Sequence, residues 1–207
     1  DYWLFEYVSI SDVLKRAPIK YYRAFLLTAT DENDLTYFLL HQSDGALNYS
    51  VICKGRRSIA SSGMGMKLKS PEALLLKFDL LGIDSSVVDE NWKPVWGEVS
   101  TIRNHYRQII LKLVDRSGSG IQLHVIFRVF NDGVGFRYVF PQQPKLNHFI
   151  IAEELTQFAM TGDHNVFWIP GDYDTNEFKY NSSKLSGVDA ASSAMSQEIH
   201  AKTFFDK

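Results

Sequence analysis

Residues 121–140, with the sequence IQLHVIFRVFNDGVGFRYVF, decide the fold. Large apolar side chains occupy alternate positions over 121–129, and the alternation resumes over 136–140. A period of two places successive side chains on opposite faces of a β-strand. The Asn-Asp-Gly triplet at 131–133 is typical of a tight hairpin turn, because these residues tolerate turn conformations. The sequence therefore predicts two antiparallel strands here, each with one buried face.

The same alternation recurs on both sides of this stretch, with no long helical period between the runs. Apolar residues alternate over 35–39, 47–53, 64–68 and 109–113, and further strand candidates lie at 149–151 and 167–169. Turn residues separate the runs at 43–45 and 54–56, and the glycine pairs at 63–65 and 118–120 are predicted to form hairpin turns. Strand after strand at short spacing predicts an all-β fold, an antiparallel β-sandwich. One short helix is expected over 11–17, ended by Pro18.

Composition excludes several classes of protein. The chain has 207 residues, of which 45% are hydrophobic and 22% charged, so it is predicted to fold around a real core. The net charge of −2 argues against binding to nucleic acid or to an anionic membrane surface. A single Cys excludes an internal disulfide and a multi-cysteine metal site. No apolar run is long enough for a membrane span.

Two tryptophans and two histidines are the first candidate functional residues. Trp92 and Trp96 flank Pro94 in a segment without a regular period. Their side chains suit stacking on a sugar, packing against another domain, or burial in this chain's own core. His105 and His164 are candidate substrate-side or interface residues, and a structural histidine bonded to backbone is the alternative for both.

Residues 172–177, DYDTNE, place oxygen ligands close together after a Pro-Gly turn. Carboxylate and amide oxygens are the ligands that Ca²⁺ prefers. The segment is not an EF-hand loop, because Glu177 stands where that loop requires Gly. A solvated turn and a calcium ligand both remain open from spacing alone.

Five stretches occur in an order that identifies a family resemblance. They lie at 89–98, 102–106, 127–138, 161–164 and 167–177, and read DENWKPVWGE, IRNHY, FRVFNDGVGFRY, TGDH and FWIPGDYDTNE. Together they resemble the N-terminal domain of glycoside hydrolase family 97, over about residues 25–185. The boundaries expected from this resemblance are an unmatched segment at 1–22, the domain itself at 23–186, and a tail or linker toward a catalytic barrel at 187–207.

The resemblance implies a fold, an activity and a metal. It implies a β-supersandwich of the galactose-mutarotase type, followed in the family by a catalytic (β/α)₈ barrel and a small C-terminal β-domain. Family members cleave α-linked glucosides or galactosides, depend on Ca²⁺, and are mostly periplasmic or exposed at the cell surface. The barrel supplies the catalytic carboxylates, so no catalytic residue is expected in this chain. The position of Glu177 matches a family glutamate that reaches the active-site Ca²⁺.

Three functional hypotheses follow. The first is an accessory domain of a calcium-dependent α-glycoside hydrolase, packed on the barrel and acting on α-linked oligosaccharides through the intact enzyme. The second is a free-standing carbohydrate-binding domain with Trp92, Trp96 and Trp168 as stacking platforms. The third is a truncated gene product without activity, suggested by the unmatched first 22 residues.

Overall fold

The computed structural model describes residues 22–28, 37–144, 146–169 and 180–189. The chain divides into two compact units, Asp1–Ala159 and Met160–Lys207, and each is described by itself. The short helix expected over 11–17 lies outside the described residues.

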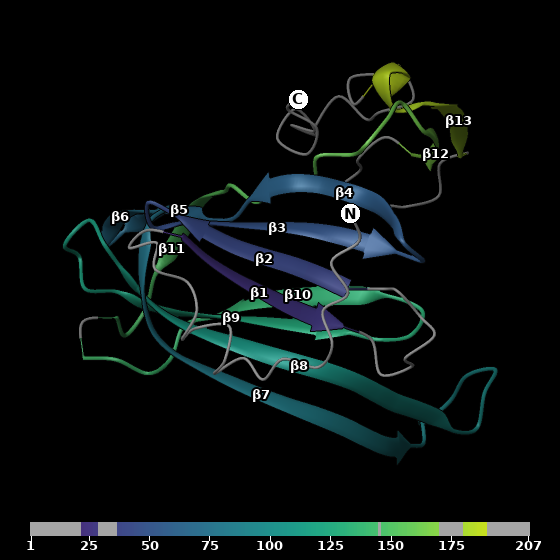
Figure 1. Ribbon diagram of the computed structural model, residues 1–207, viewed down its shortest axis with the longest axis horizontal. Coiled ribbons are helices and arrows are strands. Elements are labelled where there is room, and N and C mark those ends of the chain that lie inside the picture. The colour runs from purple at the N-terminus through teal and green to yellow at the C-terminus, as the bar shows by residue number, and fades with distance from the viewer. Residues whose placement is uncertain (1–21, 29–36, 145, 170–179, 190–207) are drawn as a thin grey trace, which may run out of the picture. The chain divides into compact units, whose positions relative to one another are not determined.

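Two four-stranded antiparallel sheets form the main part of the first unit and lie face to face (Figure 1). The first has the order β1-β2-β3-β4 and the second the order β10-β9-β8-β7. The strands of the first sheet are β1 (Tyr22–Thr28), β2 (Tyr37–Ser43), β3 (Ala46–Cys53) and β4 (Arg56–Gly63). Those of the second are β7 (Phe78–Trp92), β8 (Ile102–Asp115), β9 (Gln122–Val129) and β10 (Val134–Val139). The predicted all-β sandwich is confirmed.

Shorter elements complete the two units. A three-stranded sheet of order β11-β5-β6 belongs to the first unit, with β5 (Met66–Ser70), β6 (Glu72–Leu75) and β11 (Ile150–Glu154). The second unit contains the hairpin of β12 (Asn165–Trp168) and β13 (Asn181–Lys184), followed by the short 3₁₀ turn η1 (Leu185–Gly187).

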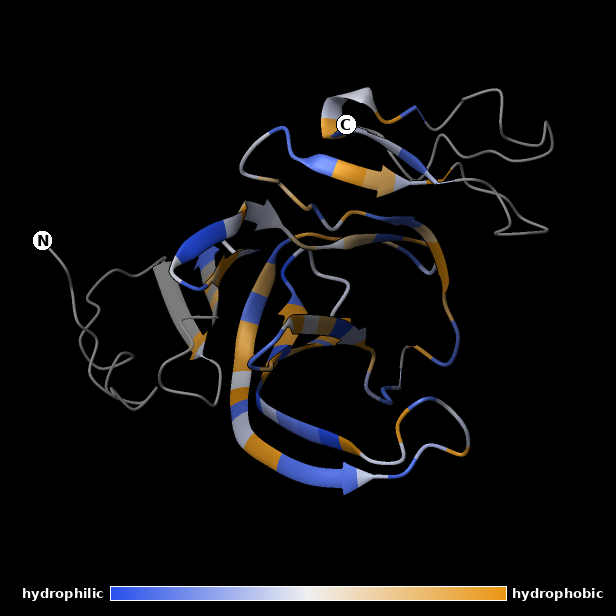
Figure 2. Cartoon of the chain, turned by 90° about the vertical axis from the view of Figure 1, so that its right-hand side faces the viewer, coloured by the Kyte–Doolittle hydropathy of each residue, from blue (hydrophilic) through white to orange (hydrophobic). Residues whose placement is uncertain are grey.

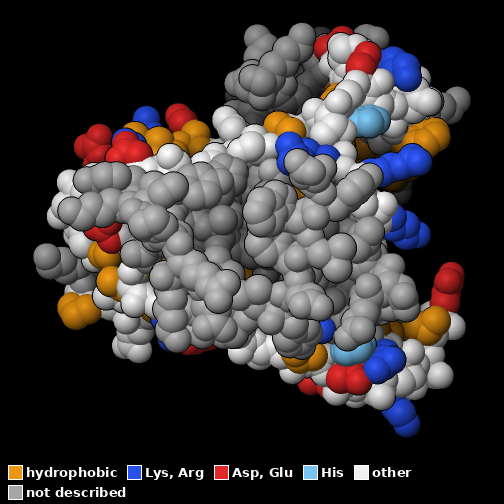
Figure 3. Space-filling model, in the orientation of Figure 1, with side chains coloured by type: hydrophobic (Ala, Val, Ile, Leu, Met, Phe, Trp, Pro, Cys, Tyr) orange, Lys and Arg blue, Asp and Glu red, His pale blue; other side chains and the backbone are white. Residues whose placement is uncertain are grey.

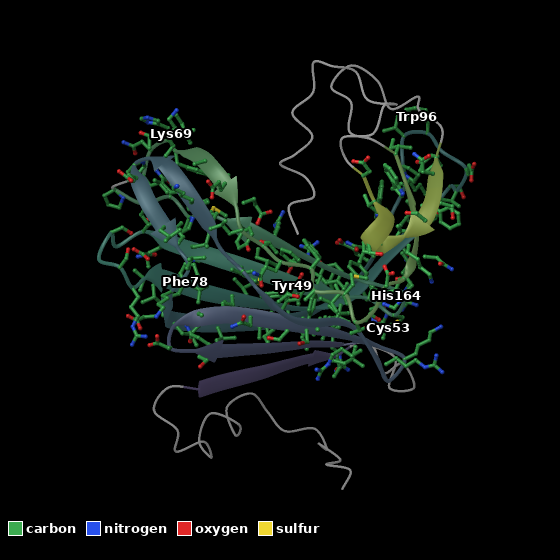
Figure 4. The ribbon with its side chains drawn as sticks, turned by 90° about the horizontal axis from the view of Figure 1, so that it is seen from above. Tyr49, Cys53, Lys69, Phe78, Trp96 and His164 are labelled. Carbon is green, nitrogen blue, oxygen red and sulfur yellow. The ribbon has the colours of Figure 1, made fainter. Side chains whose placement is uncertain are left out.

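The core lies between the two large sheets, where their apolar faces meet. In Figure 2 the strands show alternating apolar and polar bands, as expected for a sheet with one buried face. Phe127 is fully buried and makes an edge-on contact with Phe38, with ring centroids 5.1 Å apart. Tyr49 lies in the middle of this layer (Figure 4), and its hydroxyl donates a hydrogen bond to the Gln157 carbonyl oxygen at 2.6 Å. Burial is the main reason that the pKa of Tyr49 rises to about 12, so this phenol stays neutral.

Most of the turns predicted from the sequence are confirmed, and one is wrong. Asp44 and Lys54 adopt positive φ next to Gly45 and Gly55, as tight hairpins require. The glycines at 118–120 lie in the β8–β9 turn as predicted. The prediction of a hairpin at 63–65 is wrong, because this segment carries the chain from β4 in one sheet to β5 in another.

The packing around Gly65 explains that crossing. A Cβ atom at Gly65 would lie 2.5 Å from the Leu75 carbonyl oxygen and 2.6 Å from Leu76 Cδ2. Only glycine allows the backbone to approach β6 this closely. The Gly65 N–H donates to the Tyr138 hydroxyl at 3.2 Å, so the crossing is also tied to β10.

Asp115 closes the β8–β9 turn with a buried carboxylate. It accepts hydrogen bonds from the Ser117 N–H at 3.2 Å, the Ser119 N–H at 3.3 Å, the Ser119 hydroxyl at 2.6 Å and the Ser117 hydroxyl. Burial alone would raise the pKa of Asp115, but these hydrogen bonds outweigh it and hold the pKa below its usual range.

We expect Asp115→Asn to lower the free energy of unfolding by about 1–3 kcal/mol at pH 7, because the buried donors lose a charged acceptor. A carboxyl whose pKa is lowered by folding stabilises the protein above its unfolded pKa of about 3.9 and loses that effect as the pH falls through the folded value. The difference from wild type should therefore shrink below about pH 4. Urea unfolding at pH 7 and pH 3 measures it, with the exposed turn variant Asp132→Asn as control. An equal loss at both pH values would contradict this role of the charge.

Candidate functional site

A two-stranded arm extends from the second sheet and carries the sequence-predicted tryptophans. Pairing of β8 with β9 ends at Arg107 and Val129, whereas pairing of β8 with β7 continues as far as Trp92 and Ile102. The arm, residues 88–106, therefore consists of the distal parts of β7 and β8 and the loop between them (Figure 1). An isolated two-stranded ribbon is only marginally stable in water, so its side chains must hold it in place.

Cross-strand polar pairs brace the arm. The Arg103 guanidinium donates two hydrogen bonds to the Asp89 carboxylate, from Nε to Oδ1 and from Nη2 to Oδ2, each at 2.7 Å. On the other face, Asn104 Nδ2 donates to Glu90 Oε1 at 2.8 Å. The hydrogen bonds and charge of Arg103 hold the pKa of Asp89 below its usual range. The bidentate pair and the bond on the other face link the two strands of the arm to each other.

The tip of the arm is apolar and exposed. The exposed fractions are 49% for Trp92, 98% for Val95, 89% for Trp96 and 55% for Val99. Figure 4 shows Trp96 far from the core residue Tyr49, and orange segments mark the tip in Figure 2. Burial of these two tryptophans in the chain's own core, one of the alternatives above, is therefore wrong. Sequence reasoning singled out the two tryptophans but not Val95 and Val99, whose exposure only the structure shows.

His105 lies within the arm and is half-buried. Its Cα pairs with that of Asp89 across the two strands, and it alternates with Arg103 and Arg107 on one face of β8. Arg107 in turn donates to the Thr28 hydroxyl of β1 at 3.0 Å, at the point where the arm joins the sandwich. The apolar core face of β8, which includes the fully buried Ile109, thus becomes polar and basic along the arm.

The second unit holds His164. His164 is exposed; its Nε2 lies 3.5 Å from the Thr161 hydroxyl, and its carbonyl oxygen accepts the Leu185 N–H at 2.9 Å. Asp163 does not pair with this imidazole in the hydrogen bonds of the structure, since its carboxylate accepts the N–H and hydroxyl of Ser186 at 2.8 and 2.9 Å. These bonds from Ser186 hold the pKa of Asp163 below its usual range.

Trp168 lies on the hairpin of β12 and β13, at the end next to the segment that connects the two strands. Its indole N–H donates to the Ser183 hydroxyl at 3.0 Å, and its Cα pairs with that of Asn181. The segment that contains Glu177 connects these paired ends, but residues 170–179, and with them the expected calcium ligand, lie outside the described residues. Among the residues that are described, no group of three or more His, Cys, Asp or Glu side chains is arranged to hold a metal ion. None of the helices found there is long and apolar enough to cross a membrane.

These features define a class: an antiparallel β-sandwich domain with a stiff, apolar-tipped arm and no assembled metal centre among its described residues. The sequence profile of the family described as Glycosyl-hydrolase 97 N-terminal matches residues 30–203. The chain belongs to this family.

Solved structures and relatives agree with that assignment. A retaining alpha-galactosidase of Bacteroides thetaiotaomicron is 26% identical over 176 residues, covering 79% of this chain and 25% of the relative. A glycoside hydrolase family 97 enzyme of Pseudoalteromonas sp. strain K8, solved in complex with panose and with acarbose, has a TM-score of 0.67 and 27% identity. This match covers 77% of our chain and 24% of the Pseudoalteromonas enzyme. The chain therefore spans about a quarter of the length of both relatives.

Proposed function

We propose that this chain is the N-terminal accessory domain of a calcium-dependent α-glycoside hydrolase that cleaves α-glucosides or α-galactosides. The family match over residues 30–203 carries the proposal. The named activities of the relatives support it: one is a retaining alpha-galactosidase, and the other was solved with panose and acarbose. Glycoside hydrolysis requires two carboxylates around the scissile bond, and the proposal assigns both to a catalytic (β/α)₈ barrel in the same polypeptide.

The domain has three roles in this proposal. It packs on the barrel, it forms one wall of the active-site cleft, and it donates Glu177 to the active-site Ca²⁺. The hairpin of β12 and β13 supports the last role, since the bonds from Ser186 to Asp163 and from Trp168 to Ser183 stabilise the strands on either side of the Glu177 segment. Bound Ca²⁺ would supply Lewis-acid polarisation at the reacting centre. By family resemblance we place the enzyme in the periplasm or at the cell surface.

A free-standing carbohydrate-binding domain is the second candidate function. The observation that favours it is the exposure of Trp92 and Trp96, because an indole face stacks well on a sugar ring. Isothermal titration of the 207-residue chain with maltooligosaccharides and galactooligosaccharides separates the two candidates. Binding that is lost in Trp96→Ala, without any associated catalytic domain, would favour the second.

The calcium role of Glu177 is tested in the polypeptide that contains both this chain and the barrel. We expect Glu177→Gln to weaken Ca²⁺ binding by about tenfold or more, because the amide keeps the shape but loses the charge, and even groups that only support metal ligands contribute that much. The Ca²⁺-dependent rise in unfolding temperature measures the affinity without relying on turnover.

Glu153→Gln is the matched control for that experiment. Glu153 lies in β11 with an exposed side chain, 3.9 Å from Lys67 Nζ, and its loss should leave the calcium response unchanged. The 207-residue chain alone should bind Ca²⁺ weakly or not at all, since one carboxylate leaves most of the 6–8 ligand positions to water. Unchanged calcium dependence in Glu177→Gln would remove this residue from the site.

A further inference from the structure

The tip of the arm is an exposed apolar feature of the first unit. Its four exposed side chains are Trp92, Val95, Trp96 and Val99, and they are contributed by a single loop and the strand end beside it. Figure 3 shows hydrophobic side chains next to acidic and basic ones at the lower right, where Figure 1 places the end of the arm. An apolar cluster with a charged rim is the arrangement found at protein interfaces.

We propose that the arm is the docking element by which this domain binds the catalytic domain of its own polypeptide, with Trp96 as the anchor side chain. The inference rests on the proposed function and names the residues that carry out its packing role. Trp96 is 89% exposed, so almost the whole indole is available for burial in a partner pocket. Large aromatic side chains at the centre of an interface contribute most of its binding energy.

The composition of the tip favours a protein partner over a sugar. A sugar platform combines a flat aromatic face with polar groups that bond the hydroxyls. Here Val95, 98% exposed, lies directly before Trp96, and Val99 is 55% exposed two residues after Gly97, so the loop presents branched aliphatic side chains together with its indoles. Branched aliphatic groups bury well in a protein pocket and offer nothing to a sugar hydroxyl.

The size of the tip favours a partner in the same polypeptide. Stable complexes between separate proteins bury about 1,200–2,000 Å² in total, more than four side chains on one loop supply. Domains joined in one chain meet at high effective concentration, so a small contact suffices for docking. Both relatives contain this region in chains about four times as long, which leaves room for such a domain.

The bracing of the arm fits this role. The bidentate pair of Arg103 with Asp89 and the bond from Asn104 to Glu90 join the two strands next to the tip, so binding does not have to bring these strands together. The tip precedes Arg107, the first residue of β8 that pairs with β9, so a partner can cover it without disturbing the core.

Thiol accessibility tests the proposal in the intact polypeptide and in the 207-residue chain. Val95→Cys is introduced into a Cys53→Ser background, since Cys53 is exposed and would also react. Its labelling by a maleimide should be about tenfold slower or more in the intact polypeptide than in the 207-residue chain. The fully exposed position makes a folding defect unexpected, and Leu81→Cys is the control. Leu81 is 56% exposed on the same strand outside the arm, and it should react at equal rates in both proteins.

Each other outcome overturns the proposal in a distinct way. Equal labelling of the introduced thiol in both proteins means that the arm does not dock. Protection that appears only with saturating oligosaccharide assigns the tip to sugar binding. Protection of the 207-residue chain that grows with its concentration assigns the tip to contact with a second copy.

Hydrolysis of aryl α-glycosides is measured separately on the intact polypeptide. If the intact polypeptide hydrolyses these substrates while its introduced thiol still reacts, docking is refuted and the proposed hydrolase function stands. If the thiol is protected but no hydrolysis occurs, the hydrolase function is refuted and docking stands.

Discussion

Purified by itself, the 207-residue chain is expected to hydrolyse neither aryl α-glucosides nor aryl α-galactosides. Both catalytic carboxylates belong to the barrel in the proposed function, and neither protonation of the leaving group nor attack at the anomeric carbon occurs without them. The whole enzymatic acceleration, typically about 10⁶-fold or more, should therefore be absent. Release of nitrophenol from the two substrates, compared between this chain and the intact polypeptide, measures the difference.

The control for this result is the Glu177→Ala variant of the same chain. Both proteins should show only the rate of the buffer. Turnover by the wild-type chain well above that of the variant would mean that the domain holds a catalytic centre of its own, and the accessory role would then be wrong.

The largest expected effect on stability is that of Phe127→Ala. Phe127 is fully buried, with ring centroids 5.1 Å from Phe38 and 6.0 Å from Phe136, so its removal leaves a cavity between the two sheets. Large-to-small changes of this kind cost about 3–5 kcal/mol, a large fraction of the roughly 5–15 kcal/mol that stabilises a typical domain. Denaturant unfolding followed by circular dichroism measures the loss.

Phe167→Ala is the matched control, since Phe167 lies on β12 with 77% of its surface exposed. We expect that variant to stay within about 0.5 kcal/mol of wild type. A loss for Phe127→Ala no larger than for the control would contradict the placement of Phe127 at the centre of the core.

Strands with one fully buried face were predictable from the sequence, whereas the long edge strand was not. The core parts of β8 and β9 show the apolar period because their inner residues, such as Leu111 and Val125, are shielded on both sides by neighbouring strands. β7 lies at the edge of its sheet and carries Asp79, Asp84 and Asp89, of which Asp84 pairs with Lys112 at 2.7 Å. Charged edges protect a sheet from further pairing, and they also erase the apolar period that identifies a strand.

The sequence by itself therefore determined the all-β class, most of the turns, the family, and Trp92 and Trp96 as exceptional residues, because alternation, turn chemistry and collinear motifs are local properties of the chain. Only the tertiary structure decided that 63–65 crosses between sheets, that Arg103 pairs with Asp89, and that Trp92, Val95 and Trp96 are exposed at the end of a projecting arm. These features depend on strand register and on where β9 stops pairing with β8. Register is set by packing between residues distant in sequence, so no local pattern encodes it.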